Sequence, residues 1–237
     1  QISLAQQSMN RDTLKLIKRD NLTNEQYIEF IKELQRREKV PNCELIIPLP
    51  NETKQTYYDS TKKLSDAGVS VATYTLMMLQ GTELGRYEAI KKYGMKSKWR
   101  IMPRDFGTYR GKRIFDIERV CVETNTMPYE DYLTCRRFSF LIHFYSYSVF
   151  SPIRKLVKKD LNISFYDFVW LIFQALENKN NEKINANFPN KLAQIYFEFS
   201  KECEKELFDS KKDLFKFYSK DENYNKLLSA ELGDNLL

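Results

Sequence analysis

The sequence predicts an α/β fold, in which a partial parallel (β/α) barrel is followed by an all-helical C-terminal domain. Three short strand-like segments alternate with helical segments at the start of the chain, and this order is typical of parallel strands joined by right-handed crossovers. After Pro128 nearly every segment has the wide apolar stripe of a packed helix. Because three such strands can form only part of a barrel or open sheet, we expect the first strand to lack a neighbour.

Length and composition favour two globular domains, which we expect at residues 1–110 and 111–237. The chain has 42% hydrophobic and 30% charged residues, and it contains no apolar run long enough to cross a membrane. Its net charge of +6 is spread over interleaved acidic and basic residues, without a basic block. We therefore expect a soluble protein whose partner is neither a nucleic acid nor a membrane.

The four cysteines are scattered along the chain, at Cys43, Cys121, Cys135 and Cys203. This spacing indicates neither a zinc ribbon nor a disulfide framework, and it favours reduced, mostly buried thiols in a cytoplasmic protein. The chain begins directly in strand-like sequence without a secretory signal. We interpret this beginning as a cut within a longer polypeptide.

The first strand is expected at residues 2–7, where the side chains alternate with the period of two that is typical of a strand with unlike faces. Two helices follow it. Asn10 or Asp12 can cap the first helix, and Thr23 or Asn24 can cap the second.

The second strand is predicted at residues 43–47, an apolar run that Pro48 and Pro50 bring to an end. Such a run is too short for a helix and suits a buried parallel strand. A helix from about Lys54 to Asp66 follows, and Gly68 is expected to terminate it as a glycine cap.

The third strand is predicted at residues 69–76, and residues 81–84 are expected to open another helix. Residues 99–122 favour an extended strand or hairpin. Pro152 and the Asn-rich residues 178–190 are expected to be joints between the later helices. Those helices are predicted at residues 129–150, 165–176 and 192–218.

Polar residues on the predicted parallel strands are the first candidates for a binding site, because ligands of α/β folds bind at the carboxyl ends of strands. Gln7 and Ser8 end the first strand, Glu44 lies in the second and Tyr74 in the third. Glu44 is the most informative, since a carboxylate within an apolar run is costly to bury unless it is paired or binds a ligand. A salt bridge to Arg19 or a lysine is the alternative interpretation.

Four further basic residues have structural alternatives. Arg19 can stabilise the C-terminal end of the first helix through its charge. His143, on an aromatic helix face with Tyr147, favours a satisfied, partly buried residue over a ligand. The pair Arg136 and Arg137 can meet an anionic substrate or form a solvated helix edge. The sequence contains no phosphate-binding loop, zinc-protease motif or nucleophile elbow, and we assign no catalytic residue and no metal ligand.

Taken in order, several of these segments resemble the later strands of radical S-adenosylmethionine (SAM) enzymes. They are the strand ending in Gln7 and Ser8, the helix leading to Arg19, the acidic strand and loop at 44–53, and Tyr74 with the turn at 81–84. The chain is most similar to the coproporphyrinogen-dehydrogenase-like and cobalamin-binding branches, and residues 100–109 and 127–132 further resemble the cobalamin-binding branch. The resemblance extends over about residues 1–137.

This resemblance implies that residues 1–110 are the second half of a radical SAM barrel. It implies a SAM site formed by Gln7, Ser8, Arg19, Glu44 and Tyr74, in which Gln7 and Glu44 face the ribose and Arg19 reaches the carboxylate. The implied chemistry is reductive cleavage of SAM to a 5′-deoxyadenosyl radical, which acts on a small-molecule substrate.

The chain departs from the pattern of these enzymes in two respects. Pro48 and Asn51 stand where the family usually has glycine, which affects how closely the backbone can approach the cofactor. The three-cysteine CxxxCxxC loop that binds the 4Fe–4S cluster would precede Gln1 and is not part of this chain.

The resemblance therefore implies the C-terminal portion of an enzyme whose full-length form carries the cluster and the N-terminal half of the barrel. Whether cobalamin is used stays open. The alternative is a non-catalytic binding or assembly module with the same fold. The edge of the first strand would pair with the missing half of the barrel or with a second copy in a homodimer.

Overall fold

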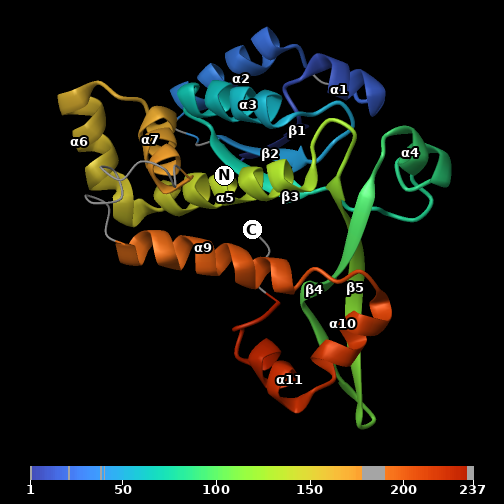
Figure 1. Ribbon diagram of the computed structural model, residues 1–237. Helices are drawn as coiled ribbons and strands as arrows, with labels where there is room; N and C mark the ends of the chain where they lie inside the picture. Colours follow the sequence, from blue (N-terminus) through green and yellow to red (C-terminus); the bar gives the residue numbers. More distant parts are fainter. Residues whose placement is uncertain (1, 21, 38, 40, 178–189, 234–237) are drawn as a thin grey trace.

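The computed structural model describes residues 2–20, 22–37, 39, 41–177 and 190–233 (Figure 1). Within these ranges β1 (Ile2–Gln7), β2 (Pro41–Ile47) and β3 (Ser70–Thr75) form a parallel sheet in the order β1-β2-β3. β4 (Lys96–Tyr109) and β5 (Lys112–Glu123) form an antiparallel hairpin. The predicted α/β class with a parallel sheet is confirmed.

Helical crossovers join the parallel strands, as the sequence predicts. α1 (Arg11–Leu16) and α2 (Asn24–Arg36) connect β1 to β2, and α3 (Lys54–Asp66) connects β2 to β3. The side chains of Asn10 and Thr23 cap the first two helices. Gly68 follows α3 with a φ of 78°, the left-handed conformation of a glycine at a helix end.

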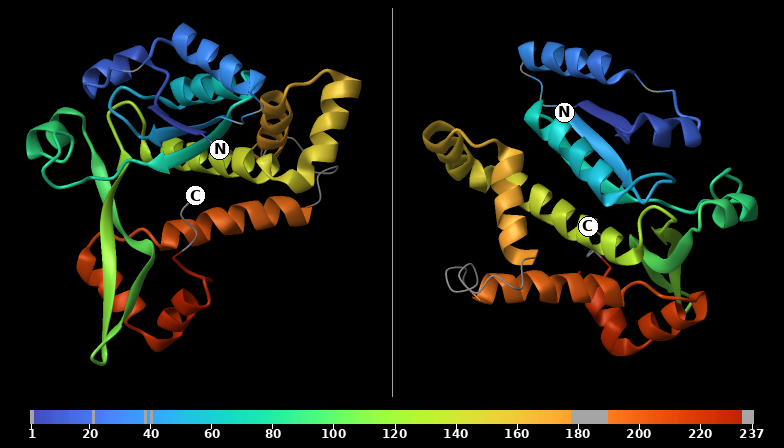
Figure 2. Two further views of the ribbon diagram at one scale, coloured as in Figure 1. Left: turned by 180° about the vertical axis from the view of Figure 1, so that it is seen from behind. Right: turned by 45° about the horizontal axis from the view of Figure 1, so that its top comes forward.

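The sheet is covered by helices on one face. Cys43, Leu45 and Ile47 of β2 are buried in the main core, together with residues of α2, α3 and the later helix α5 (Tyr129–Ser146). The alternate residues of β2, among them Glu44 and Ile46, are only half-buried. Figure 2 shows the three strands beside this helical layer. The period of two in the sequence therefore separates a helix-covered face of the sheet from a more open one.

The residues directly after β3 pair with β5, which runs antiparallel to them. The N–H of Leu76 donates to the carbonyl of Ile47 at 2.8 Å, and the carbonyl of Leu76 accepts from the N–H of Cys121 in β5 at 2.8 Å. Met77 and Val120 form an antiparallel bridge. Within the described residues, the segment after β3 thus has an antiparallel neighbour in β5, and the barrel geometry stays a prediction.

The long hairpin is closed by a two-residue turn. Arg110 and Gly111 both have positive φ values, of 49° and 75°, as in the type I′ turns that match the twist of the flanking strands. The division predicted between residues 110 and 111 falls in this turn, so β4 and β5 lie on opposite sides of it, and the division stays a prediction. Because β5 lies after it, the later part opens with a strand and is mainly rather than wholly helical.

The remaining helices lie on the left and right sides of the molecule in Figure 1 and in its lower half. They are α4 (Tyr87–Lys92), the short η1 (Ser148–Phe150), α6 (Ser151–Leu161), α7 (Phe165–Glu177), α9 (Asn190–Lys205), α10 (Lys211–Tyr218) and α11 (Asp221–Leu228). α10 and α11 pack on the hairpin in a separate cluster around Phe115 and Tyr218. None of the helices in the described ranges combines the length and the apolar character needed to span a membrane.

Three predicted boundaries are wrong. Residues 81–84 form turns, and α4 begins only at Tyr87. The helix predicted to reach residue 150 ends at Ser146. The helix predicted at 192–218 is interrupted, because Phe208 exchanges backbone hydrogen bonds with Trp99 of β4 at 2.7 and 2.8 Å. Of the predicted joints, Pro152 lies in the first turn of α6, and most of 178–190 lies outside the described residues.

Phe138 is the aromatic centre of the main core. Its ring is fully buried and meets the rings of Tyr58, Tyr166, Trp170 and Phe173 edge to face. A cavity at this position would leave these rings without a packing partner.

We therefore expect Phe138→Ala to lower the free energy of unfolding by about 3–5 kcal/mol, measured by urea denaturation. The control is Tyr87→Ala, at a side chain that is 73% exposed, which should change it by less than about 0.5 kcal/mol. Equal losses in the two variants would show that the centre of the core lies elsewhere.

Candidate functional site

Ser8, directly after β1, is held by a buried carboxyl group. Its side chain is 2% exposed, and its Oγ donates to Oε2 of Glu52 at 2.5 Å. The same Oγ accepts from the N–H of Asn10 at 3.0 Å, which leads into the cap of α1. The hydroxyl of Ser8 thus has partners within the protein, and its implied contact with SAM stays a prediction.

Glu52 joins three separate segments of the chain. It is 2% exposed and also accepts from Oγ1 of Thr56, at the start of α3, at 2.5 Å. Its backbone carbonyl accepts from Oγ1 of Thr126 at 2.8 Å, shortly before α5. Burial raises the pKa of Glu52, while the hydrogen bonds from Ser8 and Thr56 oppose that rise. Glu52 was not among the candidate residues drawn from the sequence. Its position between an apolar strand and a helix cap could have indicated a buried, hydrogen-bonded carboxyl group.

Gln7 and Arg19 lie at the C-terminal end of β1. Gln7 is half-buried, has a φ of 63°, and is paired with Leu45 after an irregularity in the β1–β2 register. The guanidinium of Arg19 donates to the carbonyl of Ala5 at 3.0 Å. Because this hydrogen bond is made to β1, Arg19 links the segment after α1 to the strand in addition to placing a charge near the end of the helix.

Glu44 and Tyr74 share the more open face of the sheet. The pairing of β2 with β3 places Glu44 opposite Ala72 and Ile46 opposite Tyr74, so Glu44 and Tyr74 are diagonal neighbours on one face. Tyr74 is 54% exposed and Glu44 is half-buried. Leu4 is paired with Cys43, the residue before Glu44, and Ala5 follows Leu4. The structure therefore brings Glu44, Tyr74 and the Ala5 contact of Arg19 to neighbouring positions on three strands.

The loop after β2 keeps a glycine-like conformation without glycine. Asn51 has a φ of 65°, in the left-handed region that glycine adopts freely and that asparagine tolerates better than most residues. The Ile47–Pro48 peptide bond is cis. The substitution of asparagine at position 51 is thus compatible with the backbone path that a glycine would take there.

The cysteines do not form a cluster site. Cys43, Cys121 and Cys135 are buried, Cys203 is partly buried, and all four are free thiols, as expected from their spacing. Burial raises the pKa of Cys121 and of Cys203 to about 12 in each case, which disfavours the thiolate that binds metals. Across the described ranges, no group of three or more His, Cys, Asp or Glu side chains could hold a metal ion. The described residues therefore do not fit a 4Fe–4S cluster.

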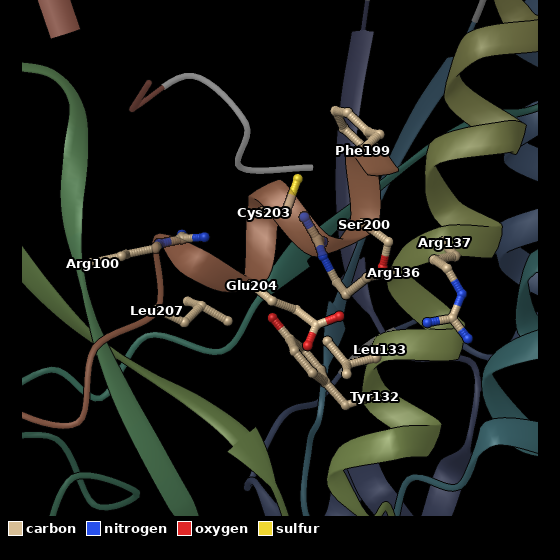
Figure 3. A pocket seen from close by; sticks show the side chains of 10 residues that line it. All are labelled: Arg100, Tyr132, Leu133, Arg136, Arg137, Phe199, Ser200, Cys203, Glu204 and Leu207. Carbon is tan, nitrogen blue, oxygen red and sulfur yellow. The ribbon is translucent and has the colours of Figure 1, made fainter. Parts of the chain in front are cut away.

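A second candidate site is the pocket between α5 and α9 (Figure 3). Arg136 and Arg137 are among its lining residues, and neither forms the solvated helix edge that was one interpretation of the pair. Arg136 is 8% exposed and donates to the carbonyl of Thr73 at 2.9 Å. Arg137 contacts both carboxylate oxygens of Glu177, at 2.6 and 3.0 Å. His143 has the satisfied role expected of it, with its Nε2 at 3.0 Å from the hydroxyl of Tyr147.

Comparison with known proteins gives a distant similarity. In a match of 147 residues that covers 59% of this chain, the chain is 29% identical to the cobalamin-dependent radical SAM methyltransferase TokK of Streptomyces tokunonensis. The match covers 20% of that protein, so the chain spans about a fifth of the length of this relative. No family model matches the sequence. The similarity supports a relationship to the radical SAM and cobalamin-binding enzymes that the motifs resemble.

The raised pKa of Glu52 predicts a pH-dependent stability. Because the folded state holds the proton more tightly than the unfolded chain does, the contribution of Glu52 is fully present below the ordinary glutamate pKa. It is lost as pH rises through the higher pKa of the folded state. Urea unfolding from about pH 4 to about pH 8 should show a smaller fall in stability for Glu52→Gln than for the natural sequence.

The control for this experiment is Glu88→Gln, at an exposed position of α4, which should leave the pH profile unchanged. Parallel profiles for Glu52→Gln and the natural sequence would contradict the prediction.

Proposed function

We propose that this chain is the C-terminal portion of a radical SAM enzyme and that it supplies part of the SAM site. The observation that carries the proposal is the meeting of Glu44, Tyr74 and the Ala5 contact of Arg19 on neighbouring strands. These residues occur in motifs that resemble radical SAM enzymes in the same order. The similarity to TokK, at 29% identity over 147 residues, supports the relationship to radical SAM enzymes on which the proposal rests.

The residues of this chain suit the polar parts of SAM. A carboxylate such as Glu44 accepts hydrogen bonds from two ribose hydroxyls, and a guanidinium such as Arg19 donates to a carboxylate. Tyr74 offers an exposed ring on the same face, against which an adenine or ribose can pack. In this proposal the chain binds and orients SAM, while the cluster that cleaves it belongs to the other portion of the enzyme.

The alternative function is a non-catalytic binding or assembly module that retains this fold. One specific observation favours it. The hydroxyl of Ser8, which the resemblance assigns to the cofactor, donates instead to the buried Glu52. A module of this kind would keep the Glu52 contacts for stability while having no need of Glu44.

The full-length gene product separates these two functions. After anaerobic iron–sulfur reconstitution, its visible spectrum should show a cluster, and the same spectrum reads out whether cobalamin is bound. The reconstituted protein should also form 5′-deoxyadenosine from SAM when a reductant is supplied. A protein that carries neither cluster nor SAM-cleaving activity would support the module.

Glu44→Ala in the full-length enzyme should weaken SAM binding by about 10- to 100-fold, because a hydrogen bond to a charged group contributes about 1.5–3 kcal/mol. Titration calorimetry with SAM measures the change. The matched control is Glu88→Ala, which removes an exposed carboxylate of α4 and should leave the affinity unchanged. Unchanged affinity in Glu44→Ala would remove Glu44 from the SAM site.

The chain by itself should bind SAM in the millimolar range or not at all, since only the ribose and carboxylate contacts are available to it. Micromolar affinity of the isolated chain would show that these contacts suffice without the cluster.

A further inference from the structure

A hollow on the hairpin lies directly after the carboxyl end of β3. β3 ends at Thr75, and the N–H of Met78 donates to the carbonyl of Arg119 in β5 at 2.7 Å, which places residues 77–80 beside the hairpin. The hollow has a volume of about 540 Å³, which is in the range of small-molecule sites. We call it the hairpin recess, and among the residues that line it are Met77, Trp99, Met102, Ile117, Arg119 and Lys211.

The lining of the hairpin recess is largely apolar and includes an aromatic ring. β4 and β5 pair Trp99 directly with Arg119, and Ile117 lies on the same face of the hairpin, two residues before Arg119. Met77 and Met102 add flexible thioether side chains, and Met77 is 38% exposed. Thioether sulfurs make favourable contacts with aromatic rings, and methionine adapts its shape to what it covers. Such a lining suits the planar, aromatic body of a small molecule.

Two basic groups border the same recess. Nε of Arg119 donates to Oγ of Ser97 at 2.7 Å, and Nζ of Lys211, the first residue of α10, lies 4.4 Å from the centre of the Trp99 ring. These partners are a hydroxyl group and an aromatic ring, and in the described part of the chain neither basic group forms a salt bridge. Arg119 is half-buried and Lys211 is exposed, so both can be reached from solvent.

The carboxylate that borders the recess, that of Glu118, is paired on the other face of the hairpin. Neighbouring residues of a strand point to opposite faces, so Glu118 and Arg119 project in opposite directions. Oε1 of Glu118 accepts from Nε of Arg100 at 2.5 Å, and the two side chains are only 9% and 12% exposed. Arg100 in turn lines the pocket between α5 and α9. The charge of Glu118 is thus matched by Arg100, and Arg119 and Lys211 make the recess positive.

We propose that the hairpin recess binds a small aromatic carboxylate, with its ring against Trp99 and the methionines and its carboxylate between Arg119 and Lys211. A carboxylate offers two oxygens, one for each basic group. The terminal nitrogens of a guanidinium can donate to it while Nε keeps its contact with Ser97, and the flexible stem of a lysine lets the ammonium group move from the ring toward an anion. The positive lining disfavours SAM itself, because its sulfonium is a cation.

The position of the recess is that of a ligand site in an α/β fold, since such ligands bind beyond the carboxyl ends of parallel strands. Met77 comes three residues after Tyr74, which lies on the open face of the sheet with Glu44. A role of the aromatic carboxylate as the substrate of the enzyme rests on the proposed function, whereas its binding to the recess does not.

The probes are 2-naphthoate and 2-naphthamide, because they share a ring system and differ in charge. NMR titration of this chain, without SAM, follows the indole N–H signals of its two tryptophans, and the signal of Trp99 is assigned by its loss in Trp99→Phe. 2-Naphthoate should bind at least about 10-fold more tightly than 2-naphthamide. It should shift the signal of Trp99 and leave that of Trp170, which packs against the main core, in place.

Lys211→Met should weaken the binding of 2-naphthoate at least about 3-fold and leave that of 2-naphthamide unchanged, and Arg119→Met should do the same. The matched control is Lys212→Met, at the next exposed lysine of α10, which does not line the recess and should leave both affinities unchanged. Equal affinities for acid and amide, no binding of 2-naphthoate, a shift of Trp170 in place of Trp99, or an equal loss in Lys212→Met would each overturn the proposal.

The comparison of the two probes on the natural sequence needs no variant, so misfolding of a variant leaves the test intact. Because SAM is absent from the titration, a negative result leaves the SAM site untouched, and a failure of SAM binding leaves the hairpin recess untouched.

Discussion

The buried carboxyl group of Glu52 is the interaction on which the placement of both candidate sites depends. Through Ser8 and Asn10 it fixes the end of β1 and the start of α1, and α1 leads to Arg19. Through Thr56 it fixes the first turn of α3. Its backbone carbonyl binds Thr126, shortly before the helix that carries Arg136. A carboxyl group is costly to bury without partners, so these hydroxyl donors are needed for the corner to be stable.

Strand β3 separates the two candidate sites through its alternation. Tyr74 lies on the open face with Glu44, whereas Thr73 and Thr75 contact the helical side. Thr73 binds Arg136 through its carbonyl, and the hydroxyl of Thr75 lies 2.9 Å from that of Tyr132. Polar contacts along β3 therefore anchor α5, and the Arg136 contact also occupies a carbonyl of a strand whose edge would otherwise be open.

The sequence allowed the parallel sheet to be predicted because its signals are local. The prolines after residue 47, the caps at Asn10 and Thr23 and the glycine at 68 each act within a few residues, and all three kinds of signal are borne out. The break at Phe208 could not be predicted in this way, since it depends on pairing with Trp99, more than a hundred positions earlier. Arg136 illustrates the same limit, because only the tertiary packing decides whether a charge on a helix is solvated or covered.

The arginines of the pocket show how the fold compensates for covered charge. Arg100 and Arg137 each have a carboxylate at close range, and breaking such a covered pair leaves an uncompensated charge. Arg136 also lines the pocket, and its guanidinium donates to the carbonyl of Thr73 in β3. The three arginines are thus held by contacts to three different elements, with Glu118 in β5, Glu177 in α7 and Thr73 in β3.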